Sequence, residues 1–214
     1  MTYNAKEHWE SIYQTKNPNE VSWYQKKPQS SLDLIAETGL DKDATIIDIG
    51  AGDSKLVDKL LALGYRNITV LDISSNALNK AKNRLGNRAN AIKWVVSDLR
   101  EFETSDRYNL WHDRAALHFL TAEEDINKYV DSVRRFLKPM GYLIVSAFSE
   151  SGPKRCSGLD IKQYSEDSMK KLFSDFEHLK SFEEEHLTPF GASQIFISSI
   201  FRKKSDKYIL DYAI

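Results

Sequence analysis

Two glycines and two acidic residues have the types and the spacing of a nucleoside-binding site. Gly50 and Gly52 lie in the segment Asp48-Ile-Gly-Ala-Gly-Asp-Ser54, directly after an apolar run rich in β-branched residues. Such glycines let the backbone pass close to a ligand, and a following helix directs unpaired N–H groups toward that ligand. Asp72 ends the next apolar run, about 20 residues after Gly52, where a carboxylate in doubly wound folds meets the hydroxyls of a ribose. A glycine turn alone is also consistent with a purely structural loop, but the turn and Asp72 together predict nucleoside binding.

The residue at position 55 narrows the choice of nucleoside. The dinucleotide fingerprint G-x-G-x-x-G requires a glycine there, and the chain has Lys55. Asp53 also adds negative charge where a pyrophosphate would lie. A cofactor with an ammonium and a sulfonium suits these carboxylates better than a nicotinamide dinucleotide does. A nicotinamide-dependent oxidoreductase is the alternative enzyme class, and a module that binds the nucleoside without turning it over is the non-enzymatic one.

The elements that must position these residues follow from the alternation of apolar runs with helical patterns. Five short, β-branched runs predict strands at 45–49, 68–72, 92–96, 108–112 and 142–146. The helical patterns between them predict a doubly wound α/β fold, with a mostly parallel sheet covered on both faces. Two later runs, 179–187 and 194–201, are joined by a short turn and so predict an antiparallel pair. We therefore expect a seven-stranded, mostly parallel sheet with a final antiparallel strand.

Further patterns predict where helices begin and end. Ser74 and Gly86 have the positions of caps around one helix, and helices are also expected at 5–15, 29–38 and 165–173. Thr121-Ala-Glu-Glu124 has the form of a capping box, and the helix it would open is expected to end near Lys138-Pro139. We expect residues 1–40 to form an N-terminal lid, residues 41–203 one domain, and residues 204–214 a tail.

The composition excludes several classes of protein. The chain has 214 residues, of which 41% are hydrophobic and 29% charged, and a formal net charge of −1. This balance gives no global attraction to nucleic acid or to an anionic membrane, so neither partner is expected. Cys156 is the single cysteine. A single cysteine cannot form an internal disulfide bond, which fits a reducing compartment. The sequence also has no signal-peptide pattern and no apolar run of about 20 residues, so we expect a cytoplasmic protein. The histidines lack metal-site spacing, so no metal is expected.

A longer motif, Leu110-Trp-His-Asp-Arg-Ala-Ala-Leu-His-Phe-Leu-Thr121, follows the fourth predicted strand. Over residues 5–203 the chain resembles the class I S-adenosylmethionine-dependent methyltransferases, whose D-x-G-x-G-x-G loop matches the loop that opens at Asp48, with Ser54 in place of the third glycine. The 110–121 stretch is similar to W-H-D-R-A-x-x-H-F-L-T of a small branch that includes the citrate synthase lysine methyltransferase. The segments 156–158 and 186–191 are similar to that branch too.

The resemblance implies a Rossmann-like fold, S-adenosylmethionine as co-substrate and direct methyl transfer to an N, O or S nucleophile. The acceptor it implies is a protein lysine or a small molecule. The cofactor-binding residues it implies are Asp48, Gly50 and Gly52 at the methionine part, Asp72 at the ribose, Ile73 and Leu99 at the adenine ring, Asp98 at the adenine amino group, and His112. Trp23 is expected to close over the cofactor, or else to fasten the N-terminal segment. Asp98 has a second interpretation as a helix N-cap.

Methyl transfer from a sulfonium needs alignment above all, and a base only where the acceptor arrives protonated. Acceptor groups gather at the ligand-facing ends of parallel strands, which makes His112, Asp113 and Arg114 candidates for the acceptor site, with His118 a turn later. Of these, His112, Asp113 and His118 are the candidate catalytic residues. Two structural alternatives stay open. His118 has the apolar neighbours of a packing histidine, and Asp113 could form an ion pair with Arg114.

Overall fold

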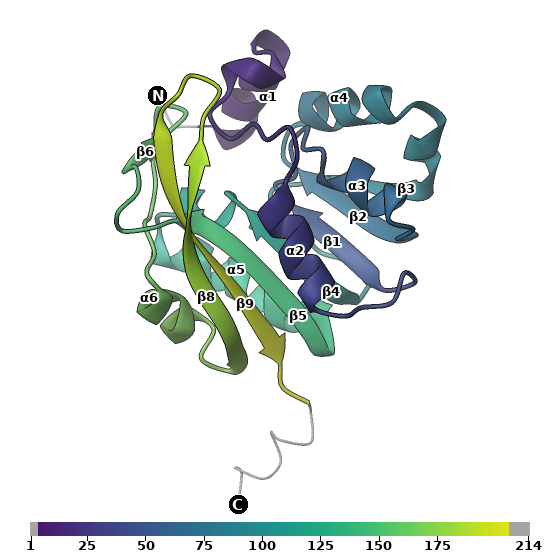
Figure 1. Cartoon of the computed structure of the whole chain (residues 1–214), viewed down its shortest axis with the longest axis vertical. Helices are drawn as coiled ribbons and strands as arrows, with labels where there is room; N and C mark the ends of the chain where they lie inside the picture. Colours follow the sequence, from purple (N-terminus) through teal and green to yellow (C-terminus); the bar gives the residue numbers. More distant parts are fainter. Residues whose placement is uncertain (1–3, 206–214) are drawn as a thin grey trace, which may run out of the picture.

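A seven-stranded sheet forms the centre of the computed structural model, which describes residues 4–205 (Figure 1). Across the sheet the strands run in the order β3 (Ile92–Val96), β2 (Asn67–Asp72), β1 (Thr45–Ile49), β4 (Tyr108–Arg114), β5 (Leu137–Phe148), β9 (Ser193–Lys203) and β8 (Phe176–Leu187). Strand β1 pairs in parallel with both β2 and β4. Strand β9 is antiparallel to both β5 and β8. The predicted doubly wound fold with one antiparallel strand is confirmed.

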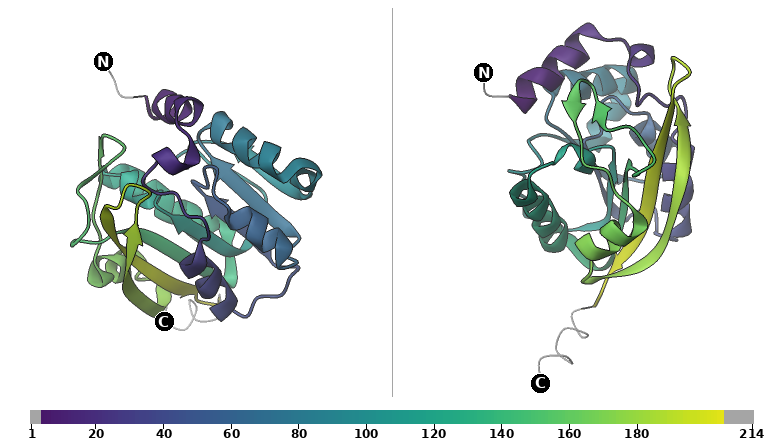
Figure 2. Two further views of the ribbon diagram at one scale, coloured as in Figure 1. Left: turned by 45° about the horizontal axis from the view of Figure 1, so that its top comes forward. Right: turned by 90° about the vertical axis from the view of Figure 1, so that its left-hand side faces the viewer.

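Helices cover both faces of the sheet (Figures 1 and 2). One face carries α2 (Gln29–Glu37), α3 (Leu56–Ala62) and α4 (Ser75–Leu85), and the other carries α5 (Glu123–Phe136) and α6 (Glu166–Leu172). Successive strand residues point to opposite faces. Ile46 and Leu110 therefore pack against the first group of helices, whereas Ile47 and Trp111 pack against the second.

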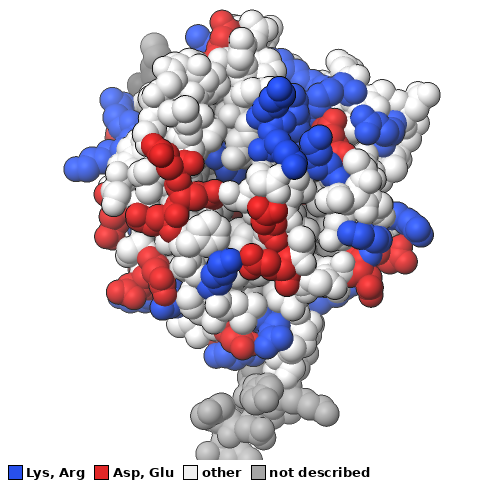
Figure 3. Space-filling view, in the orientation of Figure 1, with Lys and Arg blue, Asp and Glu red and all other residues white. Residues whose placement is uncertain are grey.

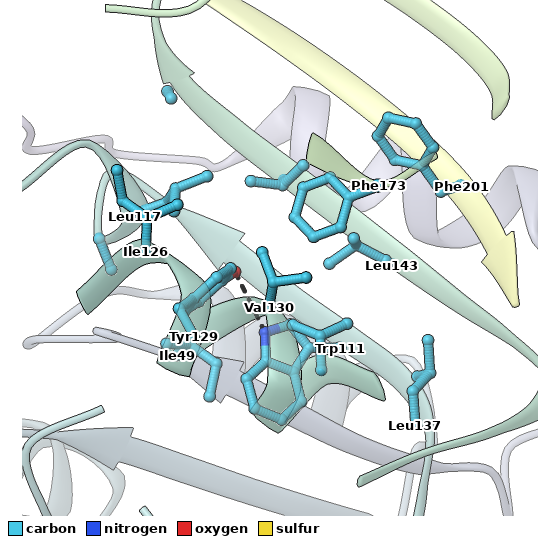
Figure 4. Close-up of a cluster of buried hydrophobic side chains, with 14 of the residues drawn as sticks. Ile49, Trp111, Leu117, Ile126, Tyr129, Val130, Leu137, Leu143, Phe173 and Phe201 are labelled. Atoms are coloured by element: carbon cyan, nitrogen blue, oxygen red, sulfur yellow. Dashed lines mark hydrogen bonds between the residues drawn. The ribbon is translucent and has the colours of Figure 1, made fainter. Parts of the chain in front are cut away.

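The core beneath α5 is aromatic and includes one buried polar contact. The indole of Trp111 in β4 donates to the hydroxyl of Tyr129 in α5 over 3.2 Å (Figure 4). Both side chains are fully buried. A buried indole N–H needs such a partner, because an unpaired one costs more than the hydrogen bond gains. The contact fixes β4, which carries residues 110–114 of the long motif, against α5.

Of four predicted helix boundaries, three are confirmed, and one is wrong. The Ser74 hydroxyl accepts from the Ala77 amide over 3.1 Å, and Gly86 ends α4 at φ +58°. The Thr121 capping box does not form, because Ala122 is the N-cap of α5 and makes no side-chain cap. The predicted end of that helix near Lys138-Pro139 is confirmed, because α5 ends at Phe136 with Leu137 as its C-cap. The chain enters β5 at Leu137, so Pro139 lies in the first part of a strand.

The chain before the sheet lies across the carboxyl ends of the strands. It contains α1 (Ala5–Thr15) and the short 3-10 helix η1 (Pro18–Glu20), and α1 lies beside α4 (Figure 2). Two further 3-10 turns are η2 (Gly86–Ala91) and η3 (Leu117–Phe119), and a small hairpin is formed by β6 (Arg155–Cys156) and β7 (Leu159–Asp160). Among residues 4–205 no helix combines the length and the apolar character needed to span a membrane. Most of the expected tail, 206–214, lies outside the described residues.

Candidate functional site

A cavity of about 240 Å³ opens at the carboxyl ends of β1, β2, β3 and β4, beneath α1. This is the edge at which ligands bind in doubly wound sheets. Its lining comes from the glycine loop, from the ends of the strands and from the N-terminal segment. The lining residues include Trp9, Tyr13, Trp23, Gly50, Asp72, Ile73, Asp98, Leu99, Arg114, Phe119 and Cys156.

A smaller cavity of about 60 Å³ lies on the other side of the glycine loop. It is lined by Asp48, Ser31, Ser54 and His112, among others. Tyr13, Trp23, Gly50 and Arg114 line both cavities. The two cavities are therefore neighbouring parts of one site, which runs across the carboxyl end of β1.

The glycine loop has the backbone geometry that requires glycine. Gly50 and Gly52 both have φ +58°, in the left-handed region that other residues rarely adopt. A Cβ on Gly50 would lie 2.6 Å from the Cβ of Ala116, and a Cβ on Gly52 would collide with the Tyr13 hydroxyl. The absence of a side chain at Gly50 thus makes room for Ala116, and the absence of one at Gly52 makes room for Tyr13. Both Ala116 and Tyr13 line the larger cavity.

Asp72 ends β2 as a buried carboxylate on the larger cavity. One oxygen accepts from the Gly52 amide and the other from the Ser74 amide, each over 2.8 Å. Burial raises the pKa of Asp72 to about 6, although these two hydrogen bonds favour the charged form. The carboxylate therefore ties the glycine loop to the start of α4 and presents its remaining acceptor capacity to the cavity.

His112 is held between two polar partners. Its Nδ1 lies 2.6 Å from Asp48 Oδ1, and its Nε2 lies 2.9 Å from the Ser31 hydroxyl. The side chain is 2% exposed. Since both ring nitrogens have partners, His112 connects β1, β4 and α2 at the smaller cavity and holds the Asp48 carboxylate in place.

Asp113 and His118, the other two candidate catalytic residues, line neither cavity. Asp113 accepts from the Ala116 and Leu117 amides and so caps the turn that follows β4. It forms no ion pair with Arg114. His118 stacks on Phe148, and its Nδ1 accepts from the Phe148 amide over 3.3 Å. Burial and Arg114 lower the pKa of His118 to about 3, which leaves it neutral.

Asp98 and Leu99 follow β3 and line the larger cavity, as does Ile73. The Asp98 carboxylate is bound by the Arg100 guanidinium, whose Nη2 donates to it over 2.5 Å. Arg100 also reaches Asp125 over 3.3 Å. Asp98 accepts from the Arg100 amide as well, over 2.9 Å. At one edge of the cavity the Arg100 guanidinium therefore binds two carboxylates, those of Asp98 and Asp125.

Aromatic rings of the N-terminal segment form the roof of the site. Trp23 packs edge-on against Trp9 at 5.7 Å and against Tyr13 at 6.1 Å, and Trp9 packs on Phe119 at 4.9 Å. The roof is held down by Glu10, which accepts from the Ser75 and Asn76 amides and from two serine hydroxyls at the start of α4. Burial opposes ionisation of Glu10, but these hydrogen bonds outweigh it and lower its pKa to about 2.

We expect Glu10→Gln to loosen this roof. The neutral amide loses the favourable interaction with the helix N-terminus and can satisfy fewer donors. Amide hydrogen exchange across residues 5–15 should become at least tenfold faster, and unfolding of the core should change much less. Glu7→Gln is the matched control, because Glu7 lies exposed on the same helix. Equal exchange in the two variants would mean that Glu10 does not hold the segment.

Asp113 gives a prediction of pH dependence. Burial raises its pKa to about 6, against hydrogen bonds from Ala116, Tyr129 and Leu117. Between about pH 4 and pH 6 the folded chain therefore binds more protons than the unfolded chain. As the pH rises through this range, ionisation of Asp113 lowers the free energy of unfolding, by about 2–3 kcal/mol once the carboxylate is fully charged. Urea unfolding without ligand measures the free energy of unfolding at pH 4.5 and at pH 7. From pH 4.5 to pH 7, this free energy should fall on the order of 1–2 kcal/mol more in wild type than in Asp113→Asn. If the free energy of unfolding falls equally in wild type and in Asp113→Asn, the pKa of Asp113 is not raised in the folded chain.

Two residues of the site were not singled out as binding or catalytic from the sequence: Cys156 and Glu10. Arg114, a candidate from the end of the fourth predicted strand, lines both cavities. Cys156 reaches the larger cavity from a hairpin whose sequence predicts no strand. The role of Glu10 could not be predicted from the sequence, because its hydrogen-bond partners lie 64 to 66 residues away in the chain. Among residues 4–205 no group of three or more His, Cys, Asp or Glu could hold a metal ion.

Part of the chain is similar to known methyltransferases. A family described as a methyltransferase domain matches residues 46–141. Malonyl-(acyl-carrier protein) O-methyltransferase 2 of Ilyobacter polytropus is 24% identical over 168 residues, which are 78% of this chain and 60% of that protein. The mouse eEF1A lysine and N-terminal methyltransferase is 25% identical over 146 residues, 66% of this chain and 20% of that protein. The match thus spans less than two thirds of the length of either relative.

The fold comparison agrees. The crystal structure of the N-methyltransferase NodS from Bradyrhizobium japonicum, in complex with S-adenosyl-L-homocysteine, superposes with a TM-score of 0.71 and 16% identity, covering 94% of this chain and 99% of NodS. The chain therefore has the Rossmann-like fold of the S-adenosylmethionine-dependent methyltransferases. S-adenosylmethionine is the co-substrate of that class of enzymes.

Proposed function

We propose that this chain transfers a methyl group from S-adenosylmethionine to an N, O or S nucleophile by direct in-line displacement. The observation that supports this most is the glycine loop between the two cavities, with Asp72 on one side and Asp48 on the other. The two glycines let the loop pass close to Ala116 and Tyr13, and both of these residues line the larger cavity, where a nucleoside would lie. The residues present fit the cofactor.

The cofactor would be held by residues from three strand ends. Asp72 would accept from the ribose hydroxyls, and Asp48, in the smaller cavity, would face the cationic methionine part. Ile73 and Leu99 would contact the adenine ring, and Asp98 its amino group, in the orientation that Arg100 fixes. Trp23 would cover the cofactor from the N-terminal segment. When bound, the cofactor supplies a methyl group on a sulfonium, which is already activated for displacement.

The contribution of the protein is then mainly alignment. Positioning of this kind is worth about 7–11 kcal/mol of the barrier. His112 acts by holding Asp48, Asp113 by fixing the turn after β4, and His118 by packing beneath that turn. All three are positioning residues in this proposal. The acceptor nucleophile gives an electron pair to the methyl carbon, the carbon–sulfur bond breaks toward sulfur, and any proton on the nucleophile leaves to water.

The acceptor class has two candidates. The resemblance to the citrate synthase lysine methyltransferase branch and the match to an eEF1A lysine and N-terminal methyltransferase support a protein lysine, whereas the match to a malonyl-(acyl-carrier protein) O-methyltransferase supports a smaller group. We expect no nucleic acid or membrane partner. Figure 3 shows basic side chains gathered near the chain between α1 and α2 and acidic ones near β8, so this face carries both signs. A cytoplasmic location remains part of the proposal.

Incubation with donor labelled in its methyl group tests the proposal. The purified chain is mixed with the labelled donor and an extract of the cells that encode it. We expect label in at least one extract component and conversion of the donor to S-adenosylhomocysteine. A chain that only senses the nucleoside would bind the donor, as measured by calorimetry, and leave every component unlabelled.

A further inference from the structure

Arg114 brings a positive charge to the point where the two cavities meet. It ends β4 and lines both of them. Within residues 4–205 no carboxylate lies within 4.0 Å of its guanidinium, and its one hydrogen bond is a long one, 3.4 Å from Nη1 to the carbonyl oxygen of Trp23. The guanidinium lies 4.6 Å from the centre of the Phe196 ring. Arg100, on the same cavity, is by contrast paired with two carboxylates.

The charge on Arg114 is not neutralised by its surroundings. Burial lowers its pKa to about 10, and Glu184 is the carboxylate that most opposes this shift. Both Glu184 oxygens already accept hydrogen bonds, one from Ser198 over 2.7 Å and one from Ser30. Arg114 is therefore charged at neutral pH, and it is desolvated without a bidentate partner. A desolvated guanidinium without such a partner is costly, and bidentate binding of a carboxylate or phosphate is what its geometry suits best.

Resting on the proposed function, we propose that Arg114 binds an anionic group, a carboxylate or a phosphate, on a small acceptor molecule beside the methyl-accepting atom. The cofactor brings a sulfonium to the same site. A sulfonium and a guanidinium repel each other, and an anion on the acceptor compensates both charges.

Two features make the acceptor small and anionic rather than a protein lysine. A lysine ammonium would add a third positive charge beside Arg114. The rings of Trp9, Tyr13 and Trp23 line the larger cavity together with Arg114, and a cavity of about 240 Å³ suits a small molecule better than a folded protein surface. The rings of Trp23 and Phe119 line the same cavity as Arg114 and offer an apolar surface to the body of such an acceptor.

The test begins with a fractionated extract. Small molecules are separated from proteins, and the small-molecule pool is divided on a strong anion exchanger at pH 7 before reaction with the labelled donor. We expect acceptor activity in the retained fraction. Phosphatase treatment of that fraction then distinguishes a phosphate, which is removed, from a carboxylate, which survives. Acceptor activity confined to the protein fraction or to the unretained pool would overturn the proposal.

Variants separate acceptor binding from cofactor binding. Arg114→Gln should reduce label transfer at least tenfold, mainly through a higher KM for the retained fraction, and should weaken S-adenosylhomocysteine binding less than threefold. Arg114→Lys keeps the charge without the fork and should recover part of the activity. Arg135→Gln, at an exposed ion pair with Glu103, is the control.

Three results distinguish the possible failures. If Arg114→Gln weakens S-adenosylhomocysteine binding tenfold, the guanidinium holds the cofactor carboxylate and the acceptor assignment is wrong. If Arg114→Gln and Arg114→Lys both transfer label as wild type does, Arg114 has no part in acceptor binding. If wild type labels no fraction although it binds the cofactor, the proposed function itself fails.

Discussion

Replacing Asp72 by asparagine is expected to weaken the binding of S-adenosylmethionine and of S-adenosylhomocysteine at least tenfold, about 1.4 kcal/mol. The asparagine side chain would keep the shape of the aspartate but lose the negative charge and one acceptor. The amides of Gly52 and Ser74 already donate to the two oxygens of Asp72. In asparagine only one oxygen remains, so fewer acceptor positions are left for the ribose hydroxyls. Titration calorimetry at pH 8 measures the change directly.

The pH dependence supplies a second readout for the same residue. Because burial raises the pKa of Asp72 to about 6, wild-type affinity should fall as the pH drops from 7.5 to 5, since the carboxylate takes up a proton. The affinity of Asp72→Asn should change less over this range. Asp131→Asn, at an exposed ion pair on α5, should behave as wild type does. Equal affinities of Asp72→Asn and wild type at pH 8 would remove Asp72 from the ribose site.

Replacing Gly52 by alanine should have a comparable effect for a different reason. The new methyl group would collide with the Tyr13 hydroxyl, and φ +58° strains any residue with a Cβ by about 1–2 kcal/mol. Tyr13 is buried and belongs to the roof, so we expect the roof to shift and cofactor affinity to fall at least tenfold. Calorimetry gives the affinity, and hydrogen exchange across residues 5–15 reports the shift.

A double variant and a matched glycine identify the cause. Tyr13→Phe removes the colliding hydroxyl, so Gly52→Ala combined with Tyr13→Phe should recover part of the affinity. Gly39→Ala is the control for backbone strain alone, because Gly39 has φ +64° and nothing within 4 Å of its added Cβ. It should lower stability and leave cofactor binding unchanged. No recovery in the double variant would show that the collision is not the reason for the loss.

Local patterns predicted the scaffold of the site because each depends on residues close in sequence. The run 45–49 and the two glycines after it identified β1 and its loop, and Ser74 and Gly86 marked the ends of α4. Where two local signals competed, the prediction failed. Thr121 and Glu124 match a capping box, yet the chain turns so that Ala122 begins α5. The end of the same helix, expected near Lys138-Pro139, was predicted correctly, because α5 ends at Phe136 and β5 begins at Leu137.

The partners of the site residues could not be predicted from the sequence, because they come from distant segments. His112 meets Asp48 and Ser31, which lie 64 and 81 residues away. Glu10 holds the roof through amides of α4. The alternative in which Asp113 and Arg114 form an ion pair is wrong, because successive strand residues point to opposite faces, so Asp113 caps the following turn while Arg114 faces the cavities.

A crystal structure of the chain with S-adenosylhomocysteine tests the central claim most directly. We predict the adenosine in the larger cavity, with both ribose hydroxyls within about 3.2 Å of the Asp72 carboxylate. The homocysteine part should pass Gly50 toward the smaller cavity. A larger cavity that stays empty at a saturating concentration of S-adenosylhomocysteine, or a ribose bound away from Asp72, would contradict the account.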